Sequence, residues 1–228
     1  MTTINCPQSW ADVKLADYLE FYRGIKPYIG TEEYAEKIPL FAVFNFTDIT
    51  EDQYRDLPES TLSEVQITLL NLLTNTQIPT IKSFDVAGIK YGFIPSLDDM
   101  AYGEYLDLVA YTKKDMWSNI PTIMSILYRP ITKQLGKSYT VEKYSGTTEE
   151  KTALFLDALT MDIVFGAISF FLDLQKDLLI GTLTYSVEEM KKIKDPKVLA
   201  ALQDLNGNGP VITQLQSYLT MTSQNLTP

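Results

Sequence analysis

Apolar residues recur at helical spacing along most of the chain, and one such pattern occurs twice. The two stripes are Leu15, Tyr18, Leu19 and Tyr22 in the first segment and Tyr102, Tyr105, Leu106 and Val109 in the second. Intervals of three and four residues place side chains on one face of an α-helix. Each stripe follows a Ser that has an Asp three residues later, at Ser9 and Ser96, which is the spacing of a capping box. The pattern predicts two short helices that each pack an aromatic and aliphatic face into the core.

A second paired signal is an Ile followed directly by a Pro. Ile38-Pro39 and Ile120-Pro121 each open an apolar run, the first to Phe46 and the second to Tyr128. Proline costs no hydrogen bond in the first turn of a helix, because its absent N–H would be unpaired there. Both runs are therefore predicted to be helices that begin near the proline.

The third paired signal is a Thr followed by a Glu three residues later. Thr61 to Glu64 and Thr147 to Glu150 both have this spacing and both precede Leu-rich residues. This is the sequence of a standard capping box at a helix N-terminus. Each half of the chain is thus predicted to contain about three helices.

The three pairs of signals occur in the same order in both halves. Their offsets are 87, 82 and 86 residues. A similar spacing in the same order favours an internal duplication, which describes a scaffold used twice more naturally than a catalytic pocket.

Residues 81–94 have a different pattern. Phe84 to Phe93 alternates and contains Ala87-Gly88 at its centre, which favours a small β-hairpin. Tyr139 to Tyr144 also alternates and is predicted to be a strand or an extended arm.

The fold class predicted from these signals is mainly α. Two tandem three-helix repeats are joined by a small β-hairpin and followed by extra C-terminal helices. The predicted bounds are 1–80 for repeat one, 81–95 for the hairpin linker, 96–160 for repeat two and 161–228 for C-terminal helices packed on the repeats. In this last region, Met161 to Gly181 is predicted to be a long, largely buried helix.

The composition excludes several classes of function. The chain has no His, which removes the usual general base and the commonest metal ligand. Its one cysteine, Cys6, cannot form an internal disulfide or a thiolate zinc site. The net charge is −10, and Lys191-Lys192-Ile193-Lys194 is the nearest approach to a basic cluster, so nucleic-acid binding is not expected.

We expect synthesis in a cytoplasm and no membrane insertion. The residues from Met1 to Asn5 lack the basic and apolar regions of a signal peptide. The most apolar stretch, 163–180, contains Asp173, Lys176 and Asp177, which suits an interior helix better than a membrane span.

Candidate metal and catalytic residues are weak. Residues 204–209 copy the first half of an EF-hand calcium loop, but position twelve of that loop is Leu215 and not Glu, so a structural turn is favoured. Adjacent carboxylates at 32–33, 98–99, 149–150 and 188–189 suit helix N-termini and single out no acid and base. Nucleotide-binding and nucleophile motifs are absent from the sequence. No enzyme activity, cofactor or metal is expected.

The most distinctive segment runs from Tyr128 to Tyr144. Arg129 lies in an aromatic-rich stretch and is predicted to stack on a Tyr or to pair with Glu142, either as an internal lock or as part of a contact surface. Tyr and Arg are enriched at interface hot spots. The interface candidates are Phe84, Val86, Ile89, Tyr91, Phe93, Tyr128, Arg129, Tyr139, Glu142 and Tyr144.

These patterns resemble a class of viral proteins. Residues 10–18, 97–108 and 127–146 are similar to small acidic proteins of tailed bacteriophages, encoded among structural and tail-morphogenesis genes, notably in phages of Bacteroidetes hosts, crAss-like phages included. The resemblance covers about residues 9 to 180. It implies a phage assembly or virion protein without catalysis.

The resemblance and the interface candidates together predict a non-enzymatic component of the portal, neck or tail region of a phage virion. Its partners would be other phage structural proteins and further copies of itself in a homo-oligomer such as a ring. One alternative is a cytoplasmic chaperone that binds a tape-measure-like protein during tail assembly. A second is a small enzyme that uses only carboxylates and Tyr.

Overall fold

The structure is a computed structural model that describes residues 4–75, 78–94, 100–112 and 115–170. Residues 1–169 form one compact unit and residues 170–228 a second. The predicted elements at Ser96 to Asp99, at 186–221 and in the half EF-hand motif lie outside the described residues. The helices and strands from Trp10 to Ala158 all belong to the first unit.

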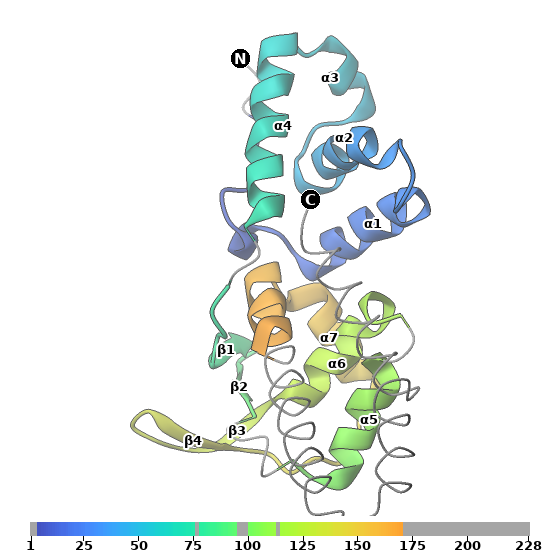
Figure 1. Ribbon diagram of the computed structural model, residues 1–228. Helices are drawn as coiled ribbons and strands as arrows, with labels where there is room; N and C mark the ends of the chain where they lie inside the picture. Colours follow the sequence, from blue (N-terminus) through green and yellow to red (C-terminus); the bar gives the residue numbers. More distant parts are fainter. Residues whose placement is uncertain (1–3, 76–77, 95–99, 113–114, 171–228) are drawn as a thin grey trace, which may run out of the picture. The chain divides into compact units, whose positions relative to one another are not determined.

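This unit is mainly helical with a small antiparallel sheet, which confirms the predicted class (Figure 1). Before the sheet come short 3-10 turns and four helices: η1 Trp10–Asp12, α1 Leu15–Ile25, η2 Lys26–Tyr28, α2 Tyr34–Phe46, α3 Glu51–Asp56 and α4 Glu59–Thr74. The remaining elements are β1 Ser83–Val86, β2 Ile89–Phe93, α5 Tyr102–Thr112, η3 Trp117–Asn119, α6 Ile120–Leu127, β3 Tyr128–Leu135, β4 Ser138–Val141, α7 Glu149–Ala158 and a helix over 161–170. Two tandem three-helix repeats are not confirmed.

The first capping box exists, but it closes a 3-10 turn. The Asp12 carboxylate accepts hydrogen bonds from the backbone N–H and the hydroxyl of Ser9, at 2.9 and 3.0 Å. These bonds lower the pKa of Asp12. The α-helix itself begins later, at Leu15. The box therefore fixes the entry into α1 and does not cap it.

An aromatic cluster forms the core of the N-terminal helices. Trp10 is buried and its ring contacts Tyr18, Phe46 of α2 and Phe165 of the 161–170 helix. The Trp10 indole N–H donates to the Asn75 carbonyl at 2.7 Å, so its polar atom is paired as well. The cluster joins residues from both ends of the unit.

Backbone pairing holds these ends together. Lys14 and Thr160 form an antiparallel β-bridge, in which Leu15 N donates to Leu159 O and Met161 N donates to Val13 O. The motif at Ser9 is thereby fixed against the end of α7.

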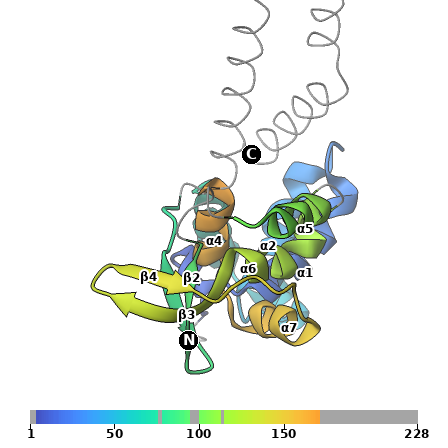
Figure 2. The same ribbon diagram turned by 90° about the horizontal axis from the view of Figure 1, so that it is seen from below.

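The sheet has the strand order β1-β2-β3-β4, with every neighbour antiparallel. The predicted hairpin is confirmed: β1 and β2 pair around Ala87 and Gly88, whose φ angles are 51° and 76°. Positive φ at both turn residues matches the right-handed twist of a two-residue hairpin. The segment predicted from Tyr139 to Tyr144 is a strand in its first part only, because β4 runs from Ser138 to Val141. Figure 2 shows the β3–β4 hairpin extending beyond the helices of this unit.

Strand β3 was not predicted. The sequence pattern indicated a helix through Tyr128, whereas α6 ends at Leu127 and Tyr128 begins β3. Pro130 explains the boundary, because a proline disfavours helical backbone at the residue before it and cannot donate a helical hydrogen bond. Pro121 does lie in the first turn of α6, as predicted.

Three other predicted helix starts are wrong. Helix α2 begins at Tyr34 and contains Pro39. Pro39 has no N–H to donate to the carbonyl of Ala35, and Ala35 is exposed. Helix α4 begins at Glu59 after Pro58, whose fixed φ suits a helix entry, so Thr61 lies inside the first turn. The cap of α7 is Thr148 and not Thr147.

Helix α7 begins one residue later than predicted because Thr148 acts as its N-cap. The Thr148 hydroxyl accepts from Lys151 N at 3.2 Å. This register places both Glu149 and Glu150 in the first turn, where the helix dipole favours negative charge.

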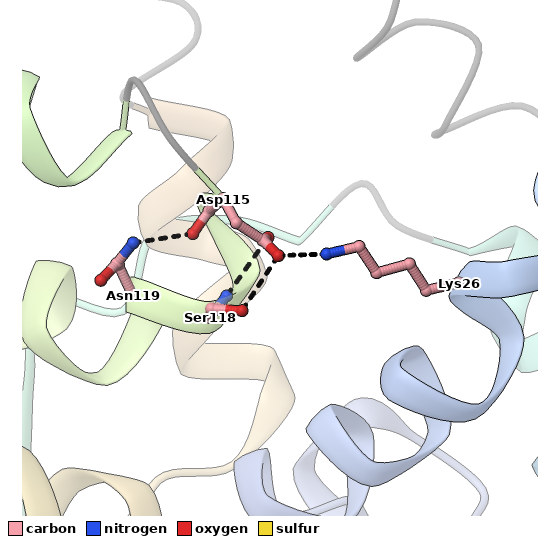
Figure 3. Close-up of polar contacts among 4 residues, drawn as sticks. All are labelled: Lys26, Asp115, Ser118 and Asn119. Atoms are coloured by element: carbon pink, nitrogen blue, oxygen red, sulfur yellow. Dashed lines mark hydrogen bonds and ion pairs between the residues drawn. The ribbon is translucent and has the colours of Figure 1, made fainter.

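A polar contact fastens the end of α1 to η3 (Figure 3). Lys26 Nζ donates to the Asp115 carboxylate, which also accepts from the Ser118 hydroxyl at 3.0 Å. The Asn119 side-chain amide donates to the Asp115 carbonyl at 2.9 Å. Although burial alone would raise the pKa of Asp115, the bonds from Lys26 and Ser118 lower it.

Candidate functional site

The segments singled out as interface candidates come together in the four-stranded sheet and the residues behind it. Phe84 and Val86 lie on β1, Ile89, Tyr91 and Phe93 on β2, Tyr128 and Arg129 on β3, Tyr139 on β4, and Glu142 and Tyr144 after it. The site therefore has two parts, a buried polar centre behind the sheet and an exposed hairpin.

Three of the candidates are buried side chains of the core. Tyr91, Phe93 and Tyr128 have almost no exposed surface. Tyr128 contacts the rings of Phe84 and Phe93, and its hydroxyl donates to the Ile81 carbonyl at 2.6 Å. Burial leaves these three side chains no surface to offer a partner. They hold the sheet to the helices.

Arg129 pairs with Glu104 of α5 and not with Glu142. Arg129 Nη2 lies 3.1 Å from Glu104 Oε1, and the two side chains are only 11% and 2% exposed. The expected internal lock exists, but its acidic partner was missed. Glu104 lies on the same helix as the second apolar stripe, and the stripe was expected to face the core in place of Glu104.

Tyr144 also contacts this ion pair, through the guanidinium of Arg129. The Arg129 guanidinium carbon lies 6.0 Å from the centre of the Tyr144 ring, within cation–π range. The Tyr144 hydroxyl donates to the Asp107 carboxylate at 2.6 Å. Burial and the bond to Asp107 raise the pKa of Tyr144. The predicted stacking of Arg129 on a tyrosine is thus present.

Hydrogen bonding of the pair is incomplete. Within the described residues, Glu104 Oε1 and Arg129 Nε have no hydrogen-bond partner, although Oε1 touches Arg129 Nη2. Glu104 Oε2 accepts from Ala101 N at 3.3 Å. A buried pair whose remaining atoms are unpaired adds little to stability, but removing one partner leaves an isolated charge. The pair therefore fixes the position of α5 more than it stabilises the fold.

Lys151 of α7 lies at the edge of the same centre. Its Nζ donates to the Ser125 carbonyl of α6 at 2.8 Å. Burial, and then the charge of Arg129, lower its pKa to about 8, while Glu142 opposes the shift. A lowered lysine pKa is found in catalytic sites and in structural networks alike. Here the bond to Ser125 joins α7 to α6, which is a structural role.

The second part of the site is the far end of the β3–β4 hairpin, residues 131–141, which we call the arm. Residues 132–138 are all exposed, and Leu135 at the tip is 87% exposed. A glycine in the left-handed region, Gly136 with φ 59°, turns the chain there. Among the residues that the structure describes, no side chain covers the tip.

The root of the arm is held firmly. The Tyr139 hydroxyl lies 2.9 Å from the Lys82 carbonyl and 2.8 Å from the Phe93 carbonyl. The Tyr139 ring lies over Gly92, where an added Cβ would approach a ring carbon to 2.5 Å. The arm is therefore a fixed projection of the sheet with an exposed end.

Exposed apolar side chains occur at a second place, on α5. Tyr102, Tyr105 and Leu106 are 75%, 47% and 46% exposed, although the sequence predicted them as core. The opposite face of α5, with Glu104, Leu108 and Thr112, is the buried one. The ion pair to Arg129 is the reason, because it turns Glu104 inward.

Other classes of site have less support. In the described part of the chain no three His, Cys, Asp or Glu residues are placed to hold a metal ion. None of the described helices has both the length and the hydropathy needed to cross a bilayer. No family model matches the chain, and no curated protein or solved structure matches it either.

Proposed function

We propose that this protein is a non-enzymatic structural component of a bacteriophage particle, in the portal, neck or tail region, and that it works through protein–protein interfaces in a multi-copy assembly. The phage setting rests on the resemblance of residues 10–18, 97–108 and 127–146. The interface role rests on the arm, which is the observation that carries the proposal.

The arm is built as a contact element. Its root is fixed by Tyr139, so a partner that binds it does not have to order a mobile segment, and preorganised contacts lose less entropy on binding. Its tip exposes Leu135 between Lys133 and Lys137. An apolar residue inside a charged rim is the arrangement of a small protein interface.

Quantitative peptide mass spectrometry on purified particles of the source phage tests this function. A structural component is expected at a fixed, small ratio to the portal protein, and the ratio should persist after the particles are washed at high salt. Recovery only at trace level, with abundant protein in infected cells, would contradict a virion role.

A second candidate function is a chaperone for a tape-measure-like protein. The exposed stripe on α5, Tyr102, Tyr105 and Leu106, favours it, because an amphipathic partner helix docks on such a row of apolar side chains. Co-purification of the protein with the tape-measure protein from infected cells, and its loss from finished particles, would support this function over the first.

A further inference from the structure

The arm is a basic projection on an acidic protein. Residues 131–141 contain Lys133 and Lys137 and no acidic residue, whereas the whole chain has a net charge of −10. Both lysines are exposed, and no salt bridge of the described residues involves either of them. Together with Leu135 they form a contact surface of one apolar residue and two cations.

Helix α4 carries a surface of the opposite kind. Ile67 and Leu70 are exposed on it, three residues apart and so on one face. Glu59 and Glu64 are exposed on the two flanks of this face. We call these four residues the α4 face. It offers two apolar residues with two anions in the preceding turns of the same helix.

We infer that the arm of one copy of this protein docks on the α4 face of a second copy. Leu135 would pack against Ile67 and Leu70, and the two lysines would pair with the two glutamates. Charge complementarity selects this occupant. The stripe on α5 is another exposed apolar surface, but the acidic residues of that helix, Glu104 and Asp107, are already engaged by Arg129 and Tyr144.

The contact would be heterologous, since the arm and the α4 face are different surfaces. Heterologous contacts repeat from copy to copy and close into a ring or continue as a filament. Repulsion between copies of net charge −10 does not prevent this, because at about 0.15 M salt the charges farther apart than about 8 Å are screened. The inference rests on the proposed function and names the interface by which the copies would assemble.

A charge exchange between two variants tests the inference. The arm variant is Lys133→Glu with Lys137→Glu, and the face variant is Glu59→Lys with Glu64→Lys. Each alone places like charges opposite each other, so self-association of the full chain should weaken about tenfold or more. An equimolar mixture of the two variants restores both pairings and should associate like the wild type. Sedimentation velocity at several concentrations in 0.15 M salt measures all four samples.

The matched control for the arm variant is Lys14→Glu with Arg23→Glu, which changes the net charge by the same amount and in the same direction at exposed positions outside both surfaces. It should associate like the wild type. Should the arm variant fail to fold by far-ultraviolet circular dichroism, Leu135→Ser provides the same readout without charge reversal. It should weaken association as well.

Two results would overturn the inference. One is a wild-type protein that stays at its monomer mass of 25.8 kDa at every concentration. The other is a mixture of the two variants that remains monomeric. Either result would leave the proposed function standing if the protein is still recovered at fixed copy number from particles. A wild type that associates normally but is absent from particles would instead contradict the proposed function alone.

Discussion

Helices α1 and α5 carry related sequences, but the matching tyrosine is enclosed in α1 and exposed in α5. In α1, Tyr18 lies among the rings of Trp10, Phe21, Phe46, Trp117 and Phe165, and burial raises the pKa of its hydroxyl. At the matching position of α5, Tyr105 is 47% exposed. The acidic residue just before each tyrosine shows the reverse pattern of burial, because Asp17 is exposed and Glu104 is buried. The apolar period predicts a helix in both cases, but its surroundings decide which face is covered.

The cause of the difference is the strand that follows α6. Arg129 on β3 offers a cation to the inner side of α5, and a buried carboxylate needs such a partner. Around α1 the neighbours are aromatic, so the tyrosine face is the one that turns inward. One half of the unit thus has an aromatic core, and the corresponding helix of the other half is fixed by an ion pair.

The largest expected effect comes from breaking that ion pair. Arg129→Ala should lower the free energy of unfolding by about 3–5 kcal/mol, because Glu104 would remain buried without a counter-charge. Asp17→Ala, at the matching position of α1, should change it by less than about 0.5 kcal/mol, because that side chain is exposed. Chemical denaturation followed by tryptophan fluorescence measures both.

A double replacement serves as the control for the pair. Glu104→Leu combined with Arg129→Met removes both charges and should recover most of the loss. Equal instability of the single and double variants would show that packing, and not the lone charge, causes the effect.

The next effect concerns the aromatic side of the comparison. Tyr18→Ala should cost about 3 kcal/mol, because it empties the centre of the ring cluster. Tyr105→Ala should cost less than about 1 kcal/mol. If the two variants unfolded with the same denaturant midpoint, α1 and α5 would be equivalent core helices.

A smaller effect is expected at the root of the arm. Gly92→Ala should destabilise by about 1–3 kcal/mol, because its Cβ would meet the Tyr139 ring. Gly103→Ala on α5 meets no atom within 4 Å and should be neutral or slightly stabilising. Differential scanning calorimetry distinguishes them, and a lower melting temperature for both would argue against the stated cause.

The smallest effect is a pH dependence from Lys151. Its pKa is about 8 in the folded state and about 10.5 when unfolded, so between these values the unfolded chain binds more protons. Stability should therefore rise with pH over this window, by less than about 1.4 kcal/mol per pH unit for a single proton.

This slope must be separated from that of Cys6. Burial raises the pKa of Cys6 above its ordinary value of 9.0, which lowers stability with rising pH. Urea unfolding between pH 7.5 and 8.5 in a Cys6→Ala background isolates the lysine, because burial raises the pKa of tyrosines such as Tyr18 and Tyr144 and their effect on stability begins only as the unfolded tyrosines ionise at higher pH. Lys151→Met should remove the rise, and a rise that survives this change would assign it to another group.

Much of the local structure could be predicted from the sequence. The hairpin at Ala87-Gly88, the helix opened by Pro121 and the strand at Tyr139 all follow from short-range rules of turn and period. Helix ends were harder where two adjacent residues suit the same cap, as with Thr147 and Thr148. The two glutamates that follow favour Thr148, because they then lie in the first turn of the helix.

The polar centre could not be predicted, because it depends on contacts between distant segments. Glu104 and Arg129 are 25 residues apart, and Arg129 lies on β3 opposite Gly92 of β2. Spacing along the chain gives Arg129 an equally good partner in Glu142. The one available signal was the proline after Arg129, which favours a strand over a helix at Arg129.

The most direct test of the different environments of Tyr18 and Tyr105 is hydroxyl-radical footprinting of the wild-type chain, with oxidation of each tyrosine measured by peptide mass spectrometry. We expect strong protection of Tyr18. We expect Tyr102 and Tyr105 to be oxidised at rates close to those of the unfolded chain. Equal protection of Tyr18 and Tyr105 in the monomer would contradict this expectation and would make the two helices equivalent.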